Sequence, residues 1–226
     1  MHGSVPAALL LLGLAIATFA AYVALDLARR VRVLRTPAGA LWLFGAAWAF
    51  GIGIWSSQVM GVAAEPIAFA YGYDGVGTLL AWLASFGAGL AGLGAISGRV
   101  ATPARVGFAA VAFGAGLVAS HALALRPLNL APGIEWSLPL LAAALIGATG
   151  GCMAAMAAFF RGGDRTRPAT LPWQLTSALV LGLTLVGSQQ LVHGAAGLGD
   201  RPRRRTSARS RRRRCCCSLR SARPRP

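Results

Sequence analysis

The chain has 226 residues, of which 56% are hydrophobic, and its mean hydropathy of +0.60 is typical of a membrane-embedded protein rather than of a large soluble core. All 22 basic residues are arginine, and 12 of them lie in the last 26 residues, so the net charge of +16 describes a tail and not the fold. The sequence shows no nucleophile beside a base, no phosphate-binding loop and no paired carboxylates, so we predict that the chain is not an enzyme.

The first two predicted elements are membrane-spanning helices. Val5 to Leu25 is an apolar run with no Lys or Arg before it and no small-residue cleavage site after it, which favours a transmembrane helix over a signal peptide. We expect Asp26 and a cluster of arginines to end this helix: Arg29, Arg30, Arg32 and Arg35. Gly39 to Ala64 is the second span, and the segment Glu65 to Gly77 after it is expected to be a loop.

Four further apolar spans follow along the chain. They are Val76 to Ser97, Val106 to Leu125, Trp136 to Phe160 and Trp173 to Leu198. Glycines lie four residues apart at the end of the third span (Gly94 and Gly98, the second just after it) and within the fifth (Gly147 and Gly151), which favours close helix packing in lipid. We therefore predict an all-α integral membrane protein, a bundle of six transmembrane helices within a domain of residues 1–199, in contact with the lipid bilayer.

The arginines between the spans predict the orientation. The loops after spans one, three and five hold four, two and three arginines, whereas the loops after spans two and four hold none and one. By the positive-inside rule the odd-numbered loops are cytoplasmic and the N-terminus lies outside.

One sequence motif occurs three times, near the outer ends of the second, fourth and sixth spans. The copies are GIGIWSSQVMGVA (51–63), GAGLVASHALALR (114–126) and GLTLVGSQQLVHG (182–194). Aligned on Gln58, His121 and Gln189, each copy has Gly seven residues earlier and Ser immediately before: Ser57, Ser120 and Ser188. Because the copies share one membrane depth, they meet in a single site if the three motif-bearing helices are neighbours.

These repeats resemble the bacterial MHYT sensor domain, a seven-helix membrane module named for a Met-His-Tyr-Thr motif at the outer ends of its second, fourth and sixth helices. The resemblance runs from about Leu9 to Leu198 and includes ALDLARRVR and GIGIWS. It implies a multi-pass protein of the bacterial inner membrane, with a periplasmic N-terminus, that senses a diatomic gas or redox signal through bound copper. It also implies an output that makes or breaks cyclic di-GMP, or a histidine kinase, here on a separate cytoplasmic signalling protein.

The residue-by-residue match changes the metal expectation. The family's His positions fall on Gln58, His121 and Gln189, and its first Met positions fall on Ser57, Ser120 and Ser188, so His121 alone is retained. Amide and hydroxyl groups are poor ligands for Cu(I). A copper set of His121, His193 and Met60 remains conceivable, and we expect it to hold copper weakly and below one ion per chain.

Other interpretations of the motif residues stay open. Gln, Ser and His in membrane helices commonly form interhelical hydrogen bonds worth roughly 1 kcal/mol without binding anything, and this structural role is the one we favour. A polar pocket for a small ligand or for protons is the second possibility, and metal binding is the third. At the level of function, the alternatives to a sensory module are a small transporter or channel and a non-functional truncated fragment.

The last segment, residues 200–226, is predicted to be disordered. Its arginine runs could bind anionic lipid or nucleic acid. However, it lacks Lys and aromatic residues, contains three consecutive cysteines, and begins where the family's seventh helix would be. We favour a frameshift product over an evolved basic tail and expect no specific nucleic-acid partner. The DNA after the codon for Gly199 should then encode an apolar segment of about 20 residues in another frame.

Overall fold

The computed structural model describes residues 4–34, 38–64, 75–98, 102–125, 136–161 and 170–197, and within these ranges it is entirely helical apart from short turns. Its six helices are α1 (Ser4–Leu34), α2 (Gly39–Ala64), α3 (Gly75–Ile96), α4 (Pro103–Leu125), α5 (Leu138–Arg161) and α6 (Leu171–Ala195). All six are long and apolar enough to cross a membrane, which confirms the predicted all-α membrane fold. The segment 200–226, with its predicted disorder, lies outside the described residues.

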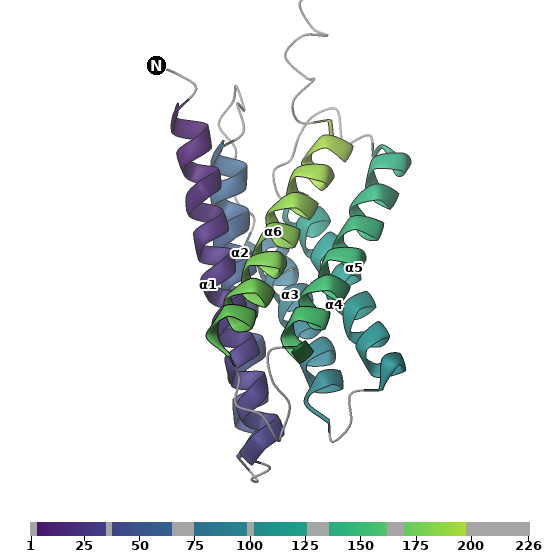
Figure 1. Cartoon of the computed structure of the whole chain (residues 1–226). Helices are drawn as coiled ribbons and strands as arrows, with labels where there is room; N and C mark the ends of the chain where they lie inside the picture. Colours follow the sequence, from purple (N-terminus) through teal and green to yellow (C-terminus); the bar gives the residue numbers. More distant parts are fainter. Residues whose placement is uncertain are drawn as a thin grey trace, which may run out of the picture.

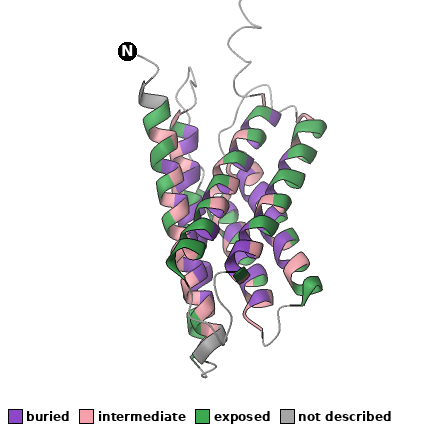
Figure 2. Cartoon of the chain, viewed as in Figure 1, coloured by how far each residue is buried: buried purple, intermediate pink, exposed green. Residues whose placement is uncertain are grey.

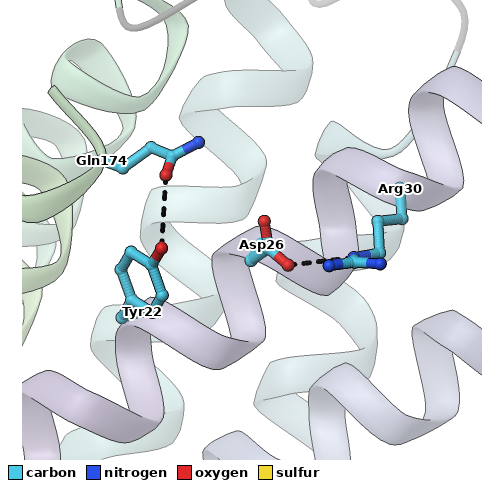
Figure 3. Close-up of polar contacts among 4 residues, drawn as sticks. All are labelled: Tyr22, Asp26, Arg30 and Gln174. Carbon is cyan, nitrogen blue, oxygen red and sulfur yellow. Dashed lines mark hydrogen bonds and ion pairs between the residues drawn. The ribbon is translucent and has the colours of Figure 1, made fainter. Parts of the chain in front are cut away.

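The predicted end of the first helix at Asp26 and the arginines was wrong in part, because α1 continues past Asp26, Arg29, Arg30 and Arg32 to Leu34, whereas Arg35 lies outside the described residues. Asp26 and Arg30 form an ion pair of 2.9 Å one turn apart along the helix, which Figure 3 shows. The guanidinium of Arg29 donates a hydrogen bond of 3.1 Å to the Phe159 carbonyl and lies 4.5 Å from the centre of the Phe159 ring. These contacts allow charged residues to extend the helix instead of ending it.

Two other boundaries differ because of proline. Helix α4 begins at Pro103 rather than at Val106, and α6 begins at Leu171, with Pro172 in its first turn, rather than at Trp173, so both prolines lie inside helices and not in the segments before the predicted spans. The first turn of a helix has backbone N–H groups without intrahelical partners, so a residue that lacks this group costs nothing there.

The six helices form a bundle, which Figure 1 shows from the side, and their mutual contacts close into a ring. Each helix packs against its neighbours in the chain, and α6 packs against α1 to complete the circle. Helices α2, α4 and α6 also contact one another across the interior. The three motif-bearing helices are therefore neighbours, as the single-site expectation required.

The ring consists of three equivalent helix pairs, α1–α2, α3–α4 and α5–α6, each more extensively packed internally than against the next pair. We call Gln58, His121 and Gln189 the motif centres. The position five residues before each motif centre is a close contact between the two helices of a pair, and one of the two residues in that contact is a glycine. A Cβ added to this glycine would overlap the other helix. These contacts are Gly53 with Ala20, Gly116 with Ala88, and Gly151 with Thr184.

The same equivalence holds between pairs. The glycine seven residues before each motif centre contacts the first helix of the next pair: Gly51 contacts Phe86, Gly114 contacts Thr149 and Gly182 contacts Thr18. The last of these contacts closes the ring. The repeated glycines are thus the close-packing positions of a pseudo-threefold arrangement.

Away from the motif residues the interior of the ring is apolar, and its exterior is apolar too, as expected for a membrane protein. Phe50, Phe113 and Leu181, each eight residues before a motif centre, are buried together in the larger hydrophobic core, and the two phenyl rings meet edge to face at 5.0 Å. Large apolar side chains such as Phe19, Leu41 and Ile146 are exposed on the outside, where Figure 2 shows exposed residues along every helix. This outer surface is suited to lipid.

Candidate functional site

The polar residues of the three motifs are buried inside the ring. Gln58 on α2, Ser120 and His121 on α4, and Ser188 and Gln189 on α6 are all at most 3% exposed. Five of the six predicted motif positions are joined by hydrogen bonds into one group. We call this group, together with Ser85 of α3, the polar cluster.

Gln58 is at the centre of the polar cluster. Its Nε2 donates hydrogen bonds to Ser120 Oγ at 2.7 Å and to His121 Nδ1 at 2.9 Å. The other ring nitrogen, His121 Nε2, lies 3.2 Å from Ser188 Oγ. The side chains of one residue from each of α2, α4 and α6 therefore form a continuous chain of hydrogen bonds.

The direction of these bonds follows from the chemistry of the donors. An amide nitrogen only donates, so His121 Nδ1 accepts and the neutral ring carries its hydrogen on Nε2. Nε2–H then donates to Ser188 Oγ, and the Ser188 hydroxyl donates to the Leu185 carbonyl at 3.0 Å. On the other side, Ser120 donates to the Ala81 carbonyl at 2.8 Å. The chain thus ends on a backbone carbonyl at each side.

Ser85 of α3 was missed in the sequence analysis. It is fully buried, and its Oγ lies 2.6 Å from Ser120 Oγ and 3.1 Å from the Ala81 carbonyl. At the equivalent ring positions of α1 and α5 the residues are Ala17 and Ala148, both also buried. A serine amid the apolar residues of its span was the available signal, but Ser85 lies on an odd-numbered helix, outside the repeated motif.

Gln189 connects α6 to α2 through the backbone. Its Nε2 donates a hydrogen bond of 3.1 Å to the Gln58 carbonyl. The amide occupies the space in front of Gly61, where a Cβ would overlap Gln189 Nε2. Gly61 is therefore required for this contact, because any side chain there would displace the glutamine.

Ser57, the sixth predicted position, is buried but faces a different neighbour. Its hydroxyl oxygen would be 3.7 Å from a Cβ placed on Gly13 of α1. Since Ser57 and Gln58 are adjacent, they point about 100° apart around the helix. Ser57 therefore belongs to the α1–α2 contact, and no hydrogen bond links it to the polar cluster among the described residues.

The three candidate copper ligands do not form a suitable site. His193 is buried one turn beyond Gln189 on α6. Met60, however, is about 200° around α2 from Gln58, and its Cβ lies against Gly13 of α1. Both nitrogens of His121 are already hydrogen-bonded, and the nearest donors are an amide and hydroxyls. This donor set does not fit Cu(I).

One acceptor in the polar cluster remains unused. Gln58 Oε1 is buried and has no hydrogen-bond partner among the described residues. If the amide rotated by half a turn, Oε1 would accept from Ser120 and from His121 Nδ1–H, and every bond from Ser120 to Ser188 could reverse. The polar cluster can therefore exist in two hydrogen-bonding states. In one, Gln58 Oε1 has no partner and His121 carries its hydrogen on Nε2; in the other, Gln58 Nε2 has no partner and His121 carries its hydrogen on Nδ1.

Comparison with known proteins gives one informative likeness. No family model and no solved structure matches the chain. A protein of Pseudomonas aeruginosa described as "Bifunctional diguanylate cyclase/cyclic di-GMP phosphodiesterase MucR" is 32% identical to it over 174 residues, which are 77% of this chain and 25% of that protein. The chain thus spans about a quarter of the length of this relative. With the six apolar helices, the likeness supports a multi-pass membrane protein in bacteria.

Proposed function

We propose that the chain is a membrane sensory input module of the MHYT type in which the polar cluster, and not a metal ion, couples the three motif-bearing helices. The observation that carries this proposal is the hydrogen-bond chain from Ser188 through His121 and Gln58 to Ser120, which joins α6, α4 and α2 at one depth. The match to a protein that makes and degrades cyclic di-GMP supports a signalling role.

The polar cluster supplies a means of changing helix packing. Loss or reversal of a buried hydrogen bond alters the free energy of the contact between two helices by roughly 1 kcal/mol. That difference is enough to shift the populations of two nearly equal packings severalfold. A signal that acts on the polar cluster would thus alter the cytoplasmic ends of α2, α4 and α6.

The output controlled by this module is proposed to be a cytoplasmic activity that makes or breaks cyclic di-GMP. The arginine distribution supports a periplasmic N-terminus in the bacterial inner membrane, with the polar cluster in the outer half of the bilayer. Sensing of a diatomic gas through copper has no support from the donor set, so the proposed signal acts on the hydrogen bonds themselves.

A chimera with the relative tests the proposal. In it this chain's residues 1–199 replace the matching 174-residue segment of the P. aeruginosa protein, and cyclic di-GMP is measured in cells lacking the native relative. We expect His121→Phe and Gln58→Leu to change the cyclic di-GMP level severalfold. The lipid-facing variant Ile52→Ala, at a position 43% exposed, is the matched control and should leave the level unchanged.

Two results would contradict the sensory role. One is a chimera whose output is the same with and without the polar-cluster substitutions, although the protein is present in the membrane. The other is solute movement in proteoliposomes of the native chain that Gln58→Leu abolishes, which would indicate a transporter.

A further inference from the structure

We infer that the Ser85 hydroxyl of α3 sets the balance between the two hydrogen-bonding states of the polar cluster. In the first, which we call the amide-donor state, Gln58 Nε2 faces Ser120 and His121; in the second, the amide-acceptor state, Gln58 Oε1 faces them. Ser85 favours the amide-acceptor state. The inference rests on the proposed function, in which the polar cluster couples the motif-bearing helices, and it names the residue that regulates that cluster.

Ser85 and Ser120 share one acceptor. Ser120 Oγ lies 2.8 Å from the Ala81 carbonyl oxygen, Ser85 Oγ lies 3.1 Å from the same oxygen, and the two hydroxyl oxygens are 2.6 Å apart. Within α3 this carbonyl also accepts the backbone N–H of Ser85, four residues later. Both serines are fully buried. Three donors therefore compete for one oxygen that has two lone pairs.

In the amide-donor state the Ser85 hydroxyl meets only acceptors that are already in use. Ser120 accepts from Gln58 Nε2 at 2.7 Å and gives its own hydrogen to the Ala81 carbonyl. Ser85 must then add a third hydrogen bond to Ala81 or a second one to Ser120 Oγ. Because an oxygen that already accepts one donor is a weaker acceptor for the next, the Ser85 hydrogen bond is weak in this state.

The amide-acceptor state relieves this competition. The Ser120 hydrogen turns to Gln58 Oε1 and leaves the Ala81 carbonyl, and Ser120 Oγ no longer accepts from the amide. Ser85 then donates to an otherwise unused Ser120 Oγ. The hydrogen bonds from Ser85 through Ser120 to Gln58 all point in one direction, and bonds in such a row strengthen one another. The Ser85 hydroxyl therefore stabilises the amide-acceptor state more than the amide-donor state.

Packing does not account for a serine at position 85. The equivalent residues of the other two helix pairs are Ala17 on α1 and Ala148 on α5, which are 0% and 1% exposed. Two of the three pairs are thus tightly packed with only a methyl group at this position. The hydroxyl of Ser85 is therefore not needed to fill space, and its contacts with Ser120 and Ala81 are its distinguishing feature.

The tautomer of His121 reports which state is populated. In the amide-donor state Nδ1 accepts from Gln58 and Nε2–H donates to Ser188; in the amide-acceptor state Nδ1–H donates to Gln58 and Nε2 accepts from the Ser188 hydroxyl. The exchange relocates one proton. During transient opening of the bundle, one water molecule delivers a proton to Nδ1 and another removes the proton of Nε2, so the ring is neutral in both states.

The test is ¹⁵N NMR of the full chain in lipid bilayers, with ¹⁵N-labelled histidine, because protonated and unprotonated ring nitrogens have different chemical shifts. The chain has three histidines, and the signals of His121 are those that disappear in His121→Phe. We expect Ser85→Ala to raise the ratio of the Nε2–H tautomer to the Nδ1–H tautomer about threefold, because it removes a hydrogen bond that is stronger in the amide-acceptor state.

Two further variants separate the hydroxyl from other effects. Ser85→Cys keeps a side chain of similar size but has only a weak donor, so it should shift the ratio in the same direction as Ser85→Ala. The control is Ser97→Ala, just after the end of α3. The Ser97 hydroxyl likewise donates to the carbonyl four residues earlier, Leu93, at 2.6 Å, but it lies about 18 Å along the helix from Ser85. This variant should keep the native ratio.

An unchanged tautomer ratio in both Ser85→Ala and Ser85→Cys would overturn the inference, as would a shift toward Nδ1–H or an equal shift in Ser97→Ala. The proposed function is tested separately, by introducing Ser85→Ala into the chimera, where it should change the cyclic di-GMP level. A changed tautomer ratio with an unchanged cyclic di-GMP level would support the role of Ser85 and contradict the sensory role of the polar cluster.

Discussion

Gln58 makes more contacts within the polar cluster than any other of its members. Its side-chain nitrogen donates to two residues of α4, and its backbone carbonyl accepts from Gln189 of α6. Its Oε1 is at the same time unpaired among the described residues. A buried polar atom without a partner costs free energy, so this residue both stabilises the bundle and leaves it able to reorganise.

Replacing Gln58 with leucine should destabilise the bundle. Gln58→Leu leaves His121 Nδ1 without its donor in an apolar environment, and we expect the free energy of unfolding to fall by about 1–3 kcal/mol. The measurement is the melting temperature of the purified protein in detergent.

Gln190→Leu is the matched control for this prediction. Gln190 is the next residue after Gln189, and its Nε2 is buried without a partner in the described part of the chain. Removing an unsatisfied amide should leave the melting temperature unchanged or raise it. A Gln58→Leu protein as stable as the native chain would show that the polar cluster does not hold the helices together.

At the scale of the elements, glycines decide which helices touch. A helix without a side chain at one position allows a neighbour's backbone or amide to fill that space, as Gly61 does for Gln189. Other glycines of the chain have no such neighbour. A Cβ added at Gly87 or Gly107 would have no atom of another described helix within 4 Å.

Gly61→Ala should therefore disrupt the contact between α2 and α6. The new methyl group overlaps Gln189 Nε2, so the glutamine must leave the Gln58 carbonyl, and we expect a loss of about 1–3 kcal/mol in the free energy of unfolding. Thermal melting with Gly87→Ala and Gly107→Ala as controls checks this, because those changes should be neutral or slightly stabilising.

A double variant separates the overlap from other effects. Combining Gly61→Ala with Gln189→Ala removes the overlapping amide. The loss in free energy of unfolding caused by Gln189→Ala should therefore be smaller in the Gly61→Ala protein than in the native chain. Additive losses would mean that the two residues do not interact in the folded protein.

For the whole molecule, metal binding depends on residues from three helices. We expect the native chain to hold copper weakly and below one ion per chain, because the polar cluster offers an amide and hydroxyls where Cu(I) requires softer ligands. The fourfold variant Ser57→Met, Gln58→His, Ser188→Met and Gln189→His should raise the copper content after dialysis against a mild chelator. His121→Ala is the comparison, and one tightly held copper in the native chain that is lost in His121→Ala would refute the structural interpretation of these residues.

The orientation of the whole ring is the second prediction at this scale. Cysteines introduced one at a time at Asp74 and Arg165, in a background with Cys215, Cys216 and Cys217 changed to serine and Cys152 retained as a buried residue of α5, should label from opposite sides of the membrane. We expect a membrane-impermeant reagent to reach Asp74→Cys from the periplasm and Arg165→Cys only after the membrane is opened. Labelling of Arg165→Cys from the periplasm would reverse the proposed topology.

The sequence by itself determined the class of fold and the number of spans, because long apolar runs in water-free surroundings can only be helices that satisfy their own backbone. It also identified the equivalence of Gln58, His121 and Gln189, since repetition is visible without coordinates. It could not show where α1 ends, because the ion pair of Asp26 and the contacts of Arg29 with Phe159 depend on how side chains pack around the helix.

Only the tertiary structure decided which polar groups meet. The rotation of each helix about its axis is set by side-chain packing with its neighbours, and this rotation places Ser85 in the polar cluster while turning Ser57 and Met60 toward α1. The closure of the ring likewise brings Asp26 opposite Gln174, although 148 positions separate them in the chain. Such contacts are long-range consequences of packing, and no local pattern of residues encodes them.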